Sequence, residues 1–459
     1  MLNDIALKDL RALLGNRFLE PSTPAYEAAC EIWNAAARRK PLAIAKCRSG
    51  DDVAAAVKSA TTAGLAVSVR GGGHNIAGTA LADGALTIDL TEMRDITIDA
   101  KNHLAHVGGG ATWAELDAAA QEHGLATPGG VVSTTGVAGL TLGGGFGWLA
   151  RLHGLAADNL ISAKLVLADG RKVTASETQH ADLFWAIRGG GGNFGVATQL
   201  TFRLHALAPQ VLFGPTFFAL EDAETVLNAY ARHAPNLPRA GCVWANLMTA
   251  PPAPVLPKDR HGTKVLTLMQ FFAGPEDIGR DHLQNLYGGV TPLGDGVMMR
   301  PFVEAQQFLD PTYPFGARNY WRAHNHAALS PALISCLVDL AADLPTPESE
   351  LLICHLGGAI SDKATGDTAY PHRAVPFMST PGVRWHDAGD DARMVDWLKA
   401  ASARIAEHAD PGAYVNFVAE RAGREDEAYG QNMARLAKIK QTYDPGNLFR
   451  VNQNVKPKD

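Results

Sequence analysis

The order of apolar and polar positions changes repeatedly along the first part of the chain, and each change indicates a separate element. Residues 43–49 have a strand pattern, residues 51–64 an amphipathic helical pattern, and residues 66–70 a second strand pattern. Either Asp51 or Asp52 is expected to cap the helix, because a carboxylate accepts hydrogen bonds from the free backbone N–H groups of the first turn. The three stretches together predict a βαβ unit.

Strict alternation of apolar and polar residues follows at residues 84–90 and 95–100, and a further strand pattern occupies residues 105–110. A period of two is typical of strands with one buried face. With the βαβ unit, these strands predict a small α/β domain over roughly the first 110 residues.

Directly after these strands, Thr112 and Glu115 form a capping-box pattern at the start of a helix. Beyond Gly147, a second α/β subdomain is predicted. Residues 161–176 have the pattern of a β-hairpin, residues 181–189 that of a short helix, and residues 195–204 that of an alternating strand. The order of these patterns indicates a second layer of helices and strands.

The remaining stretches differ in pattern from this first half. Residues 1–15 have an amphipathic helical pattern, and residues 208–410 are richer in Pro and aromatic residues, which indicates a separate domain. The end of the chain returns to a strand pattern at residues 414–420 and a helical pattern at residues 427–443.

Composition narrows the class of protein. The 459 residues suffice for two or three domains, and the 41 basic and 47 acidic residues are well mixed, so nucleic acid is not an expected partner. Five cysteines without a CxxC pair favour a reducing compartment, and no long apolar run predicts a membrane span. The protein is expected to be soluble and cytoplasmic. His324 and His326 have the wrong spacing for a metal site, so no metal is expected.

Glycine is the most unevenly distributed residue type. The chain has 46 glycines, and they are concentrated in four clusters between residues 71 and 195. Glycine is retained where the backbone needs positive φ or must come close to another group. The clusters are RGGGH from Arg70, VGGGATW from Val107, GGVVSTTGVAGLTLGGGFG from Gly129 and RGGGGNFG from Arg188. They indicate a large ligand lying on bare main chain.

Two of these clusters allow more than one interpretation. The RGGGH cluster is consistent with a nest of N–H groups that binds a pyrophosphate, and equally with a tight turn. The role of His74 is therefore ambiguous from this cluster alone. The cluster at residues 188–195 contains GxGxxG spacing, but a helical pattern precedes it and a strand pattern follows, which is the reverse of a Rossmann site. There is no P-loop motif, so nucleoside-triphosphate chemistry is not supported.

Five motifs occur in a defined order and carry a family resemblance. They are SVRGGGHN from Ser68, the GG…TTGVAG…LGGGFG block from Gly129, GLAADNL from Gly154, LFWAIRGGGGNFGVAT from Leu183 and YDPGNLFRVNQNV from Tyr443. Over nearly its whole length the sequence resembles the berberine-bridge-enzyme-like branch of the vanillyl-alcohol-oxidase/PCMH flavoproteins. Residues 208–410 match more loosely.

The resemblance implies an α+β fold with a divided cofactor domain. A PCMH-type FAD-binding domain of two α/β subdomains is expected at residues 36–207, with residues 411–459 completing it. Residues 208–410 are expected to form a substrate domain with an antiparallel sheet covered by helices. Residues 1–35 would be an N-terminal helical segment.

The resemblance also implies a covalent cofactor. The family histidine at the position of His74 bonds to the 8α-methyl carbon of FAD, and a glycine-flanked loop gives such a histidine room to reach the flavin edge. Many members have a second bond to a cysteine, which would fall at Val132. Since Val132 cannot form that bond, a single histidyl linkage is expected, with a noncovalent flavin as the alternative.

Further cofactor contacts follow from the same motifs. At the pyrophosphate they are Arg70, Gly71, Gly72, Gly73 and Asn75, and Gly78 would let the cofactor pass close to the backbone. Near the isoalloxazine they are Thr134, Gly136, Gly139, Gly143 and Gly144. Val196 is expected near the adenine, and Asn452 and Asn454 near the flavin ring. For the two asparagines, capping of the final turn is the alternative.

The catalytic base has two candidates. Tyr414 resembles the family tyrosine that lies over the flavin, where a depressed pKa would let it act as a phenolate. Tyr414 and Asn416 are expected on one face of a strand, and a buried structural tyrosine is the alternative. Asp362 resembles an acid that some members use instead, although a surface turn explains it as well.

The implied activity is an FAD-dependent oxidase. It would move a hydride from a C–OH or C–NH carbon of a small organic substrate to flavin N5 and reduce O2 to H2O2. The alternatives are a dehydrogenase with another electron acceptor and a flavin-binding protein without turnover. Sugars, alkaloids, amines and polyketide alcohols all remain open as substrates.

Overall fold

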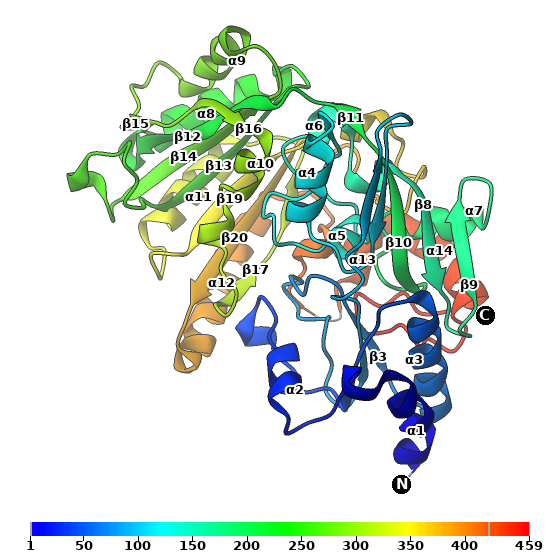
Figure 1. Cartoon of the computed structure of the whole chain (residues 1–459). Helices are drawn as coiled ribbons and strands as arrows, with labels where there is room; N and C mark the ends of the chain where they lie inside the picture. Colours follow the sequence, from blue (N-terminus) through cyan, green and yellow to red (C-terminus); the bar gives the residue numbers. More distant parts are fainter. Residues whose placement is uncertain (1, 421–422, 459) are drawn as a thin grey trace.

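The computed structural model describes residues 2–420 and 423–458. Figure 1 shows the amino-terminal half and the carboxyl-terminal segment together on one side, and the strands coloured green to orange as a large sheet on the other. Separate sheets with helices packed on them make the fold α+β, as expected from the sequence.

A four-stranded sheet contains the predicted βαβ unit. Its strands, in spatial order, are β1 (Phe18–Leu19), β2 (Ala43–Lys46), β4 (Leu86–Asp89) and β3 (Val67–Arg70). The helix α3 (Gly50–Ala63) connects β2 to β3, and β4 lies between these two strands and is parallel to both. The helix and both strands are confirmed.

The predicted cap of α3 is wrong by two or three residues. Ser49 is the N-cap, and its hydroxyl accepts a hydrogen bond from the backbone N–H of Asp52. Ser49 has an extended backbone, as a capping residue requires, whereas Asp51 and Asp52 already lie inside the first turn. The acidic pair still favours the helix, because negative charge is stabilised near the N-terminal end of the helix dipole.

The predicted amino-terminal helix is confirmed over the described residues as α1 (Leu2–Leu14), and the segment also contains α2 (Pro24–Ala29). Leu7, Leu10 and Leu14 of α1 are buried in the same core as residues of α3. The segment is therefore more than helical, since β1 adds an antiparallel strand to the first sheet.

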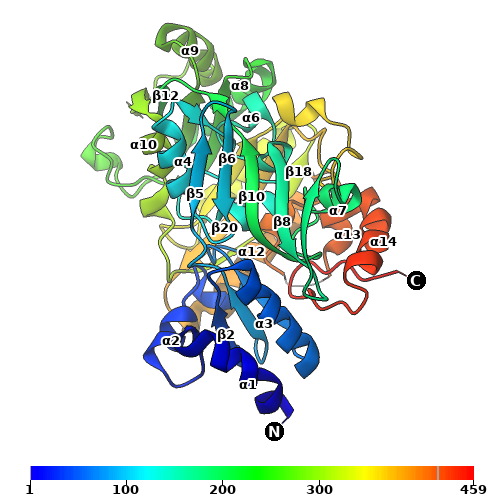
Figure 2. The same cartoon turned by 45° about the vertical axis from the view of Figure 1, so that its right-hand side comes forward.

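A five-stranded antiparallel sheet forms the second layer (Figure 2). Its strands, in spatial order, are β5 (Ile96–Asp99), β6 (Leu104–Gly108), β10 (Val196–Arg203), β8 (Leu160–Val166) and β9 (Lys172–Ser176). The capping box at α4 (Trp113–Gln121), the hairpin β8–β9 and the short helix α7 (Ala181–Ala186) are confirmed.

The same sheet corrects the prediction of one α/β domain over the first 110 residues. Strands β5 and β6 pair with each other and with β10, so they belong to the second layer. Their pattern gave the strands correctly, but alternation along a strand carries no information about the distant strand with which it pairs.

A nine-stranded antiparallel sheet forms the other body (Figure 1). Its central path is β15 (Gly294–Asp295), β12 (Gln210–Ala219), β14 (Lys264–Phe272), β13 (Gly241–Thr249), β19 (Glu350–His355), β20 (Phe377–Trp385) and β17 (Arg318–Trp321). In addition, β16 (Met298–Pro301) pairs with β12, and β18 (His324–His326) pairs with β20.

One face of this sheet is covered and the other borders a cavity. The helices α8 (Ala223–His233), α11 (Pro331–Ala342) and α12 (Asp391–Ala406) share a core with the Val243 and Ala245 side chains of β13. The alternate β13 residues, such as Trp244 and Asn246, line the cavity. The period of two along the strand thus separates structural from cavity-facing side chains.

The carboxyl-terminal segment returns to the first body. The strand predicted at residues 414–420 is wrong, because the chain there forms a single 3-10 turn over Val415–Phe417. The predicted helix at residues 427–443 is interrupted at Gly430, whose φ is +47°, and forms α13 (Glu425–Tyr429) and α14 (Met433–Tyr443). Leu436 of α14 shares a core with α7.

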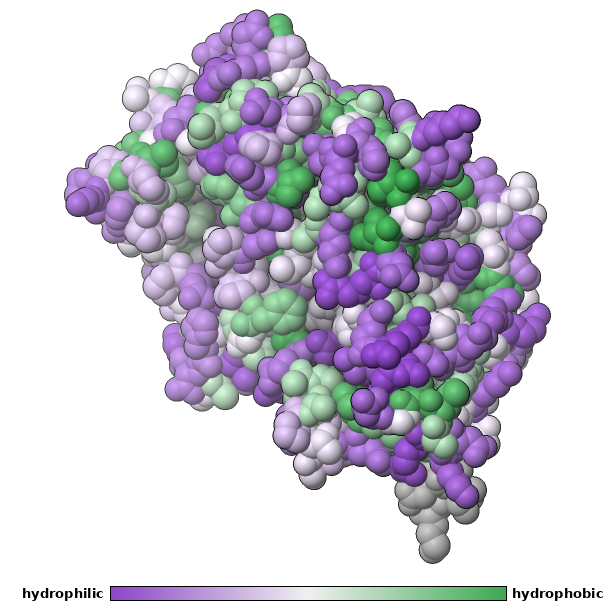
Figure 3. Space-filling model, in the orientation of Figure 1, coloured by the Kyte–Doolittle hydropathy of each residue, from purple (hydrophilic) through white to green (hydrophobic). Residues whose placement is uncertain are grey.

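Shorter elements complete the chain. They are β7 (Leu125–Ala126), α5 (Val137–Leu142), α6 (Ala150–His153), β11 (His205–Ala206), α9 (Glu276–Leu283) and α10 (Phe302–Gln307). Polar residues dominate the face shown in Figure 3, with apolar residues in small groups. Among the described residues, no helix combines the length and apolarity needed to cross a membrane.

Candidate active site

A cavity of about 450 Å³ lies between the glycine-rich loops and the bare face of the nine-stranded sheet. Several motifs that are distant in sequence meet on its wall. The expected site residues on the wall are Gly71, Gly72, Gly73, His74, Asn75, Gly136, Gly139, Tyr414, Asn416 and Asn452. Val132, where a second flavin linkage would require cysteine, also lines the cavity.

Two glycine loops touch each other on the cofactor side of this wall. A Cβ at Gly72 would lie 2.4 Å from the backbone nitrogen of Gly136, and a Cβ at Gly136 would lie 2.4 Å from the nitrogen of Gly72. Contacts that short do not occur between real atoms, so both positions require glycine. The loops therefore present bare backbone, on which a flat and extended ligand can lie closely.

The electrostatics of this wall fit a ligand bound by main chain. No Lys or Arg of the described residues lines the cavity. Arg70, expected at the pyrophosphate, instead donates a hydrogen bond to the carbonyl of Ala29, and its Nε lies 3.9 Å from a carboxylate oxygen of Asp89. Consecutive N–H groups from Gly71 to His74 can still bind a pyrophosphate. The backbone cradle thus fits FAD without a cationic side chain.

His74 lies on the cavity wall in an aromatic setting. Its Nε2 is 2.8 Å from Thr134 Oγ1, its ring stacks on Trp33 with a centroid distance of 5.5 Å, and the Phe315 ring lies edge-on at 5.0 Å. Burial lowers the pKa of His74 to about 4, so the imidazole is neutral at pH 7. Nδ1 has no hydrogen-bond partner among the described residues and is the nitrogen open to a further bond.

Several expected cofactor residues do not line the cavity. They are Arg70, Gly78, Thr134, Gly143, Gly144, Val196 and Asn454. Gly143 has a structural reason to be glycine, because a Cβ there would lie 2.1 Å from Asn416 Oδ1. Val196 is buried in the core, while its neighbours Gly195 and Ala197 line the cavity.

The asparagine tail supports both of its proposed roles. Asn452 Nδ2 donates to the carbonyl of Phe449 at 3.2 Å, which is the turn-capping role. Its Oδ1 is buried without a partner, as is Oδ1 of Asn454. An orphaned buried acceptor indicates a missing hydrogen-bond donor, and Asn452 is on the cavity wall where flavin N–H groups would be available. Gln453, which sequence reasoning missed, also lines the cavity with an orphaned Oε1.

Tyr414 and Asn416 lie together, although not for the reason expected. The 3-10 turn brings Asn416 Nδ2 to 2.8 Å from the Tyr414 hydroxyl oxygen, where a strand would have only placed them on one face. The backbone N–H of Gly145 donates to the same oxygen at 3.1 Å. Both donors stabilise negative charge on that oxygen.

The expected depressed pKa of Tyr414 is not what the structure shows. Burial raises the pKa of Tyr414, the neighbouring Tyr370 adds to the increase, and the hydrogen bonds from Asn416 and Gly145 oppose it without reversing it. A fully buried phenol loses more hydration free energy on ionising than two donors restore. The protein alone therefore keeps the hydroxyl protonated at neutral pH.

Asp362 is not brought to the cavity. It lies on an exposed turn, and both of its carboxylate oxygens bind the guanidinium of Arg239, at 2.6 and 2.8 Å. That hydrogen bonding lowers the pKa of Asp362. A surface ion pair agrees with the ordinary alternative from the sequence, and the structure leaves Tyr414 as the candidate that faces the cavity.

The substrate side of the cavity was missed by sequence reasoning. Its lining from the nine-stranded sheet includes Trp244, Asn246, Met248, Thr267, Met269, Glu350, Leu352 and Thr380. No motif marks these residues, because each is an ordinary strand residue at every second position. Only the alternation itself could have shown which residues share a face.

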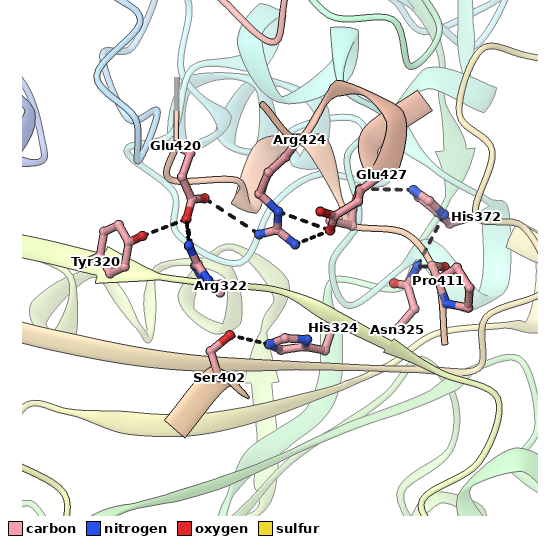
Figure 4. Close-up of polar contacts among 11 residues, drawn as sticks. Tyr320, Arg322, His324, Asn325, His372, Ser402, Pro411, Glu420, Arg424 and Glu427 are labelled. Atoms are coloured by element: carbon pink, nitrogen blue, oxygen red, sulfur yellow. Dashed lines mark hydrogen bonds and ion pairs between the residues drawn. The ribbon is translucent and has the colours of Figure 1, made fainter. Parts of the chain in front are cut away.

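A polar network joins the carboxyl-terminal segment to the nine-stranded sheet (Figure 4). The Glu420 carboxylate accepts hydrogen bonds from the Tyr320 hydroxyl and from Arg322 Nε, both at 2.7 Å. On the same segment, the carbonyl of Ala413, next to Tyr414, accepts a hydrogen bond from His372 Nε2 at 3.0 Å. The network therefore attaches the segment that carries Tyr414 to the nine-stranded sheet.

Comparison with known proteins agrees with this geometry. A family model described as "FAD binding domain" matches residues 41–176, and one described as "Berberine and berberine like" matches residues 413–456. These two segments carry the glycine loops and Tyr414 respectively. Fold and cavity therefore define an FAD-linked oxidoreductase.

Full-length relatives assign the family. The uncharacterized FAD-linked oxidoreductase YvdP of Bacillus subtilis is 30% identical, covering 97% of this chain and 98% of its own. The carbohydrate oxidase of Microdochium nivale is 28% identical over 95% of this chain and 92% of its own. The crystal structure of 6-hydroxy-D-nicotine oxidase from Arthrobacter nicotinovorans matches with a TM-score of 0.85 and 26% identity, covering 96% and 98% of the two chains. The chain belongs to the berberine-bridge-enzyme-like family of FAD-linked oxidoreductases.

Proposed function

We propose that this protein is an oxidase that removes a hydride from a substrate carbon bearing OH or NH and transfers the two electrons to O2, giving H2O2. Bound FAD supplies the hydride acceptor and the site of O2 reduction. The observation that carries the proposal is the Tyr414 hydroxyl on the cavity wall, held by two hydrogen-bond donors. Oxidases among the relatives support the choice of O2 as electron acceptor.

Tyr414 is proposed to accept the proton that leaves the substrate O–H or N–H when the hydride leaves carbon. Asn416 Nδ2 and the Gly145 N–H remain bonded to the phenolic oxygen in both protonation states and reduce the cost of its negative charge. Because burial raises the pKa of Tyr414, the base form is populated only as the pH rises above neutral. The rate is therefore expected to increase towards alkaline pH.

The test is a spectroscopic screen of the holoenzyme. Alcohols, secondary amines and reducing sugars are added without air, and a substrate is expected to bleach the flavin absorption. Admitting air should then restore the colour within one mixing time and release one H2O2 per substrate oxidised. Persistent bleaching in air would instead show a dehydrogenase, and a flavin that no compound in the screen reduces would support a binding protein without turnover.

We also propose that His74 carries the flavin through a single covalent bond. Its place on the cavity wall, its neutral ring and its open Nδ1 support this role. Cysteine is absent from the described lining, and Val132 stands where the second linkage would form. Protein precipitated with acid and washed is expected to stay yellow, and the His74→Ala variant to lose its colour under the same treatment.

A further inference from the structure

One carboxylate stands out in a cavity that is otherwise without formal charge. Glu350 is the only acidic residue among the described residues that line the cavity, and no Lys or Arg accompanies it there. It is the first residue of β19, which lies between β13 and β20 in the nine-stranded sheet, and it lines the cavity from the sheet side. The following inference rests on the proposed function, because it concerns the substrate of that same cavity.

Two neutral groups orient the Glu350 carboxylate. The Tyr313 hydroxyl donates to Oε1 and Asn246 Nδ2 donates to Oε2, each at 2.6 Å. Within residues 2–420 and 423–458, no ion pair within 4 Å includes Glu350, and the guanidinium of Arg384 lies over the Tyr313 ring, 4.6 Å from its centre, without contacting the carboxylate. A half-buried charge without a counterion is costly, and a cation in the cavity would relieve that cost.

The neighbouring amide adds a second acceptor. A carboxylate can only accept hydrogen bonds, so Asn246 must turn its nitrogen towards Glu350 and its oxygen away. That oxygen, Asn246 Oδ1, is buried and has no partner. Glu350 and Asn246 thus form an acceptor-only pair, which is complementary to a group with several N–H donors, such as an ammonium ion.

The rest of this wall is mainly apolar. It is lined by Trp244, Met248, Met269, Leu352 and Phe217, together with Thr267 and Thr380, whose hydroxyl groups are buried without a partner. Aromatic and aliphatic side chains of this kind bind a carbon skeleton through its buried area, and the tryptophan ring also attracts a cation. A polyhydroxylated substrate would leave most of its hydroxyl groups without partners against such a surface.

The acceptor pair is distant from the proposed base. Glu350 and Cys354 lie on the same face of β19, four residues apart, which corresponds to about 13 Å along a strand. Cys354 lies in the same core cluster as Tyr414, at the other end of this span. A group bound by Glu350 is therefore remote from the carbon that faces the Tyr414 hydroxyl.

We propose that the substrate is an organic cation with an apolar body, whose protonated amine binds to Glu350 and Asn246 Oδ1 while a separate carbon, away from that amine, reacts next to Tyr414. Glu350 is a specificity-determining residue in this arrangement. The amine that it binds stays protonated and is not the group that is oxidised.

Binding to the oxidised holoenzyme tests the proposal without turnover. 3-Phenylpropylamine is titrated against the flavin absorption spectrum, in parallel with the neutral 3-phenylpropan-1-ol and N-acetyl-3-phenylpropylamine. The wild-type protein is expected to bind the amine about tenfold to a hundredfold more tightly than either neutral analogue. Equal affinities for the three compounds would overturn the proposal, and this comparison requires no variant to fold.

The matched variants are Glu350→Gln and Glu348→Gln. Glu348 is exposed on the same segment, and among the described residues its carboxylate pairs with His386 alone, so its substitution is expected to leave all three affinities unchanged. Glu350→Gln should remove most of the preference for the amine and leave the affinity for the alcohol within about twofold. A parallel loss of affinity for amine and alcohol would show a structural role and contradict the assignment.

The proposed oxidase function can fail independently. If the amine binds through Glu350 but no compound bleaches the flavin, the cation site holds and the proposed oxidase function is wrong. If neutral compounds bleach the flavin and the amine shows no binding advantage, the oxidase holds and the cation site is wrong.

Discussion

The two sides of the cavity are built from different parts of the polypeptide. On the cofactor side the backbone forms the surface, and loops such as those of Gly72 and Gly136 approach so closely that no side chain fits between them. On the substrate side alternate side chains of a sheet form the surface, such as Trp244 and Asn246 of β13. A backbone surface needs glycine at fixed positions, whereas a sheet surface accepts any residue with strand propensity.

This difference has consequences for substitution. An added methyl group on the cofactor side meets backbone that cannot move, so the expected defect is loss of cofactor. A changed side chain on the substrate side leaves the sheet hydrogen bonds intact, so the expected defect is altered affinity or rate. The carboxyl-terminal segment joins the two sides, because it carries Tyr414 to the cavity and binds the sheet through Glu420.

The largest effect on cofactor content is expected for Gly72→Ala on the cofactor side. The new Cβ would lie 2.4 Å from the Gly136 nitrogen and would force the two loops apart. Overpacking of this kind costs about 1–3 kcal/mol, so the affinity for FAD before the covalent bond forms is expected to fall on the order of tenfold, and less flavin is incorporated. The ratio of flavin to protein absorption measures it. Gly366→Ala, where nothing lies within 4 Å, is the control and should retain full flavin.

Tyr414→Phe is expected to have the largest effect on the rate, without a change in cofactor content. Loss of a general base lowers kcat/KM by about 10²–10⁴-fold. In the wild type, burial raises the pKa of Tyr414, so kcat/KM should increase with pH above neutral, and the variant should lose this alkaline increase. Asp362→Asn is the matched control, since Asp362 pairs with Arg239 on the surface. A pH profile unchanged in Tyr414→Phe would assign the base elsewhere.

The same contrast explains what the sequence can and cannot predict. The glycine clusters, α3 and the strands β2 and β3 were predictable because local spacing determines them. The sheet to which β5 belongs and the 3-10 turn at Tyr414 were not, because contacts with residues distant in the sequence hold both. No sequence pattern marked Glu350 as a site residue, because a single glutamate in a strand becomes distinctive only when the fold places it in a cavity without other charged side chains.

His74→Ala sharpens the comparison on the cofactor side. The backbone cradle is intact in this variant, so FAD is expected to bind without a covalent bond and to be released by acid precipitation. The rate should fall less than in Tyr414→Phe, because the residues around the reacting carbon are unchanged. Absorption spectra of washed pellets and supernatants measure the linkage. Colour retained in the pellet of the variant would place the bond on another residue.

The smallest effect is expected for Glu420→Gln, which weakens the attachment of the carboxyl-terminal segment to the nine-stranded sheet. Burial by itself raises the pKa of Glu420, but hydrogen bonding to Tyr320 and the charge of Arg322 outweigh it, so the pKa is lowered in the folded protein. A carboxylate with a lowered pKa stabilises the fold above its unfolded pKa of about 4.3, and this contribution is lost as the pH falls through the folded value.

The Tm difference between wild type and Glu420→Gln should therefore correspond to about 1–2 kcal/mol at pH 7 and shrink towards zero in acid. Differential scanning calorimetry at pH 7 and at lower pH measures it, with Glu348→Gln as an exposed carboxylate control. If this attachment also positions Tyr414, kcat should fall together with Tm while the flavin content stays constant. A Tm shift with unchanged kcat would mean that the network stabilises the fold without orienting the base, because the hydrogen bond from His372 to Ala413 would then suffice to hold Tyr414.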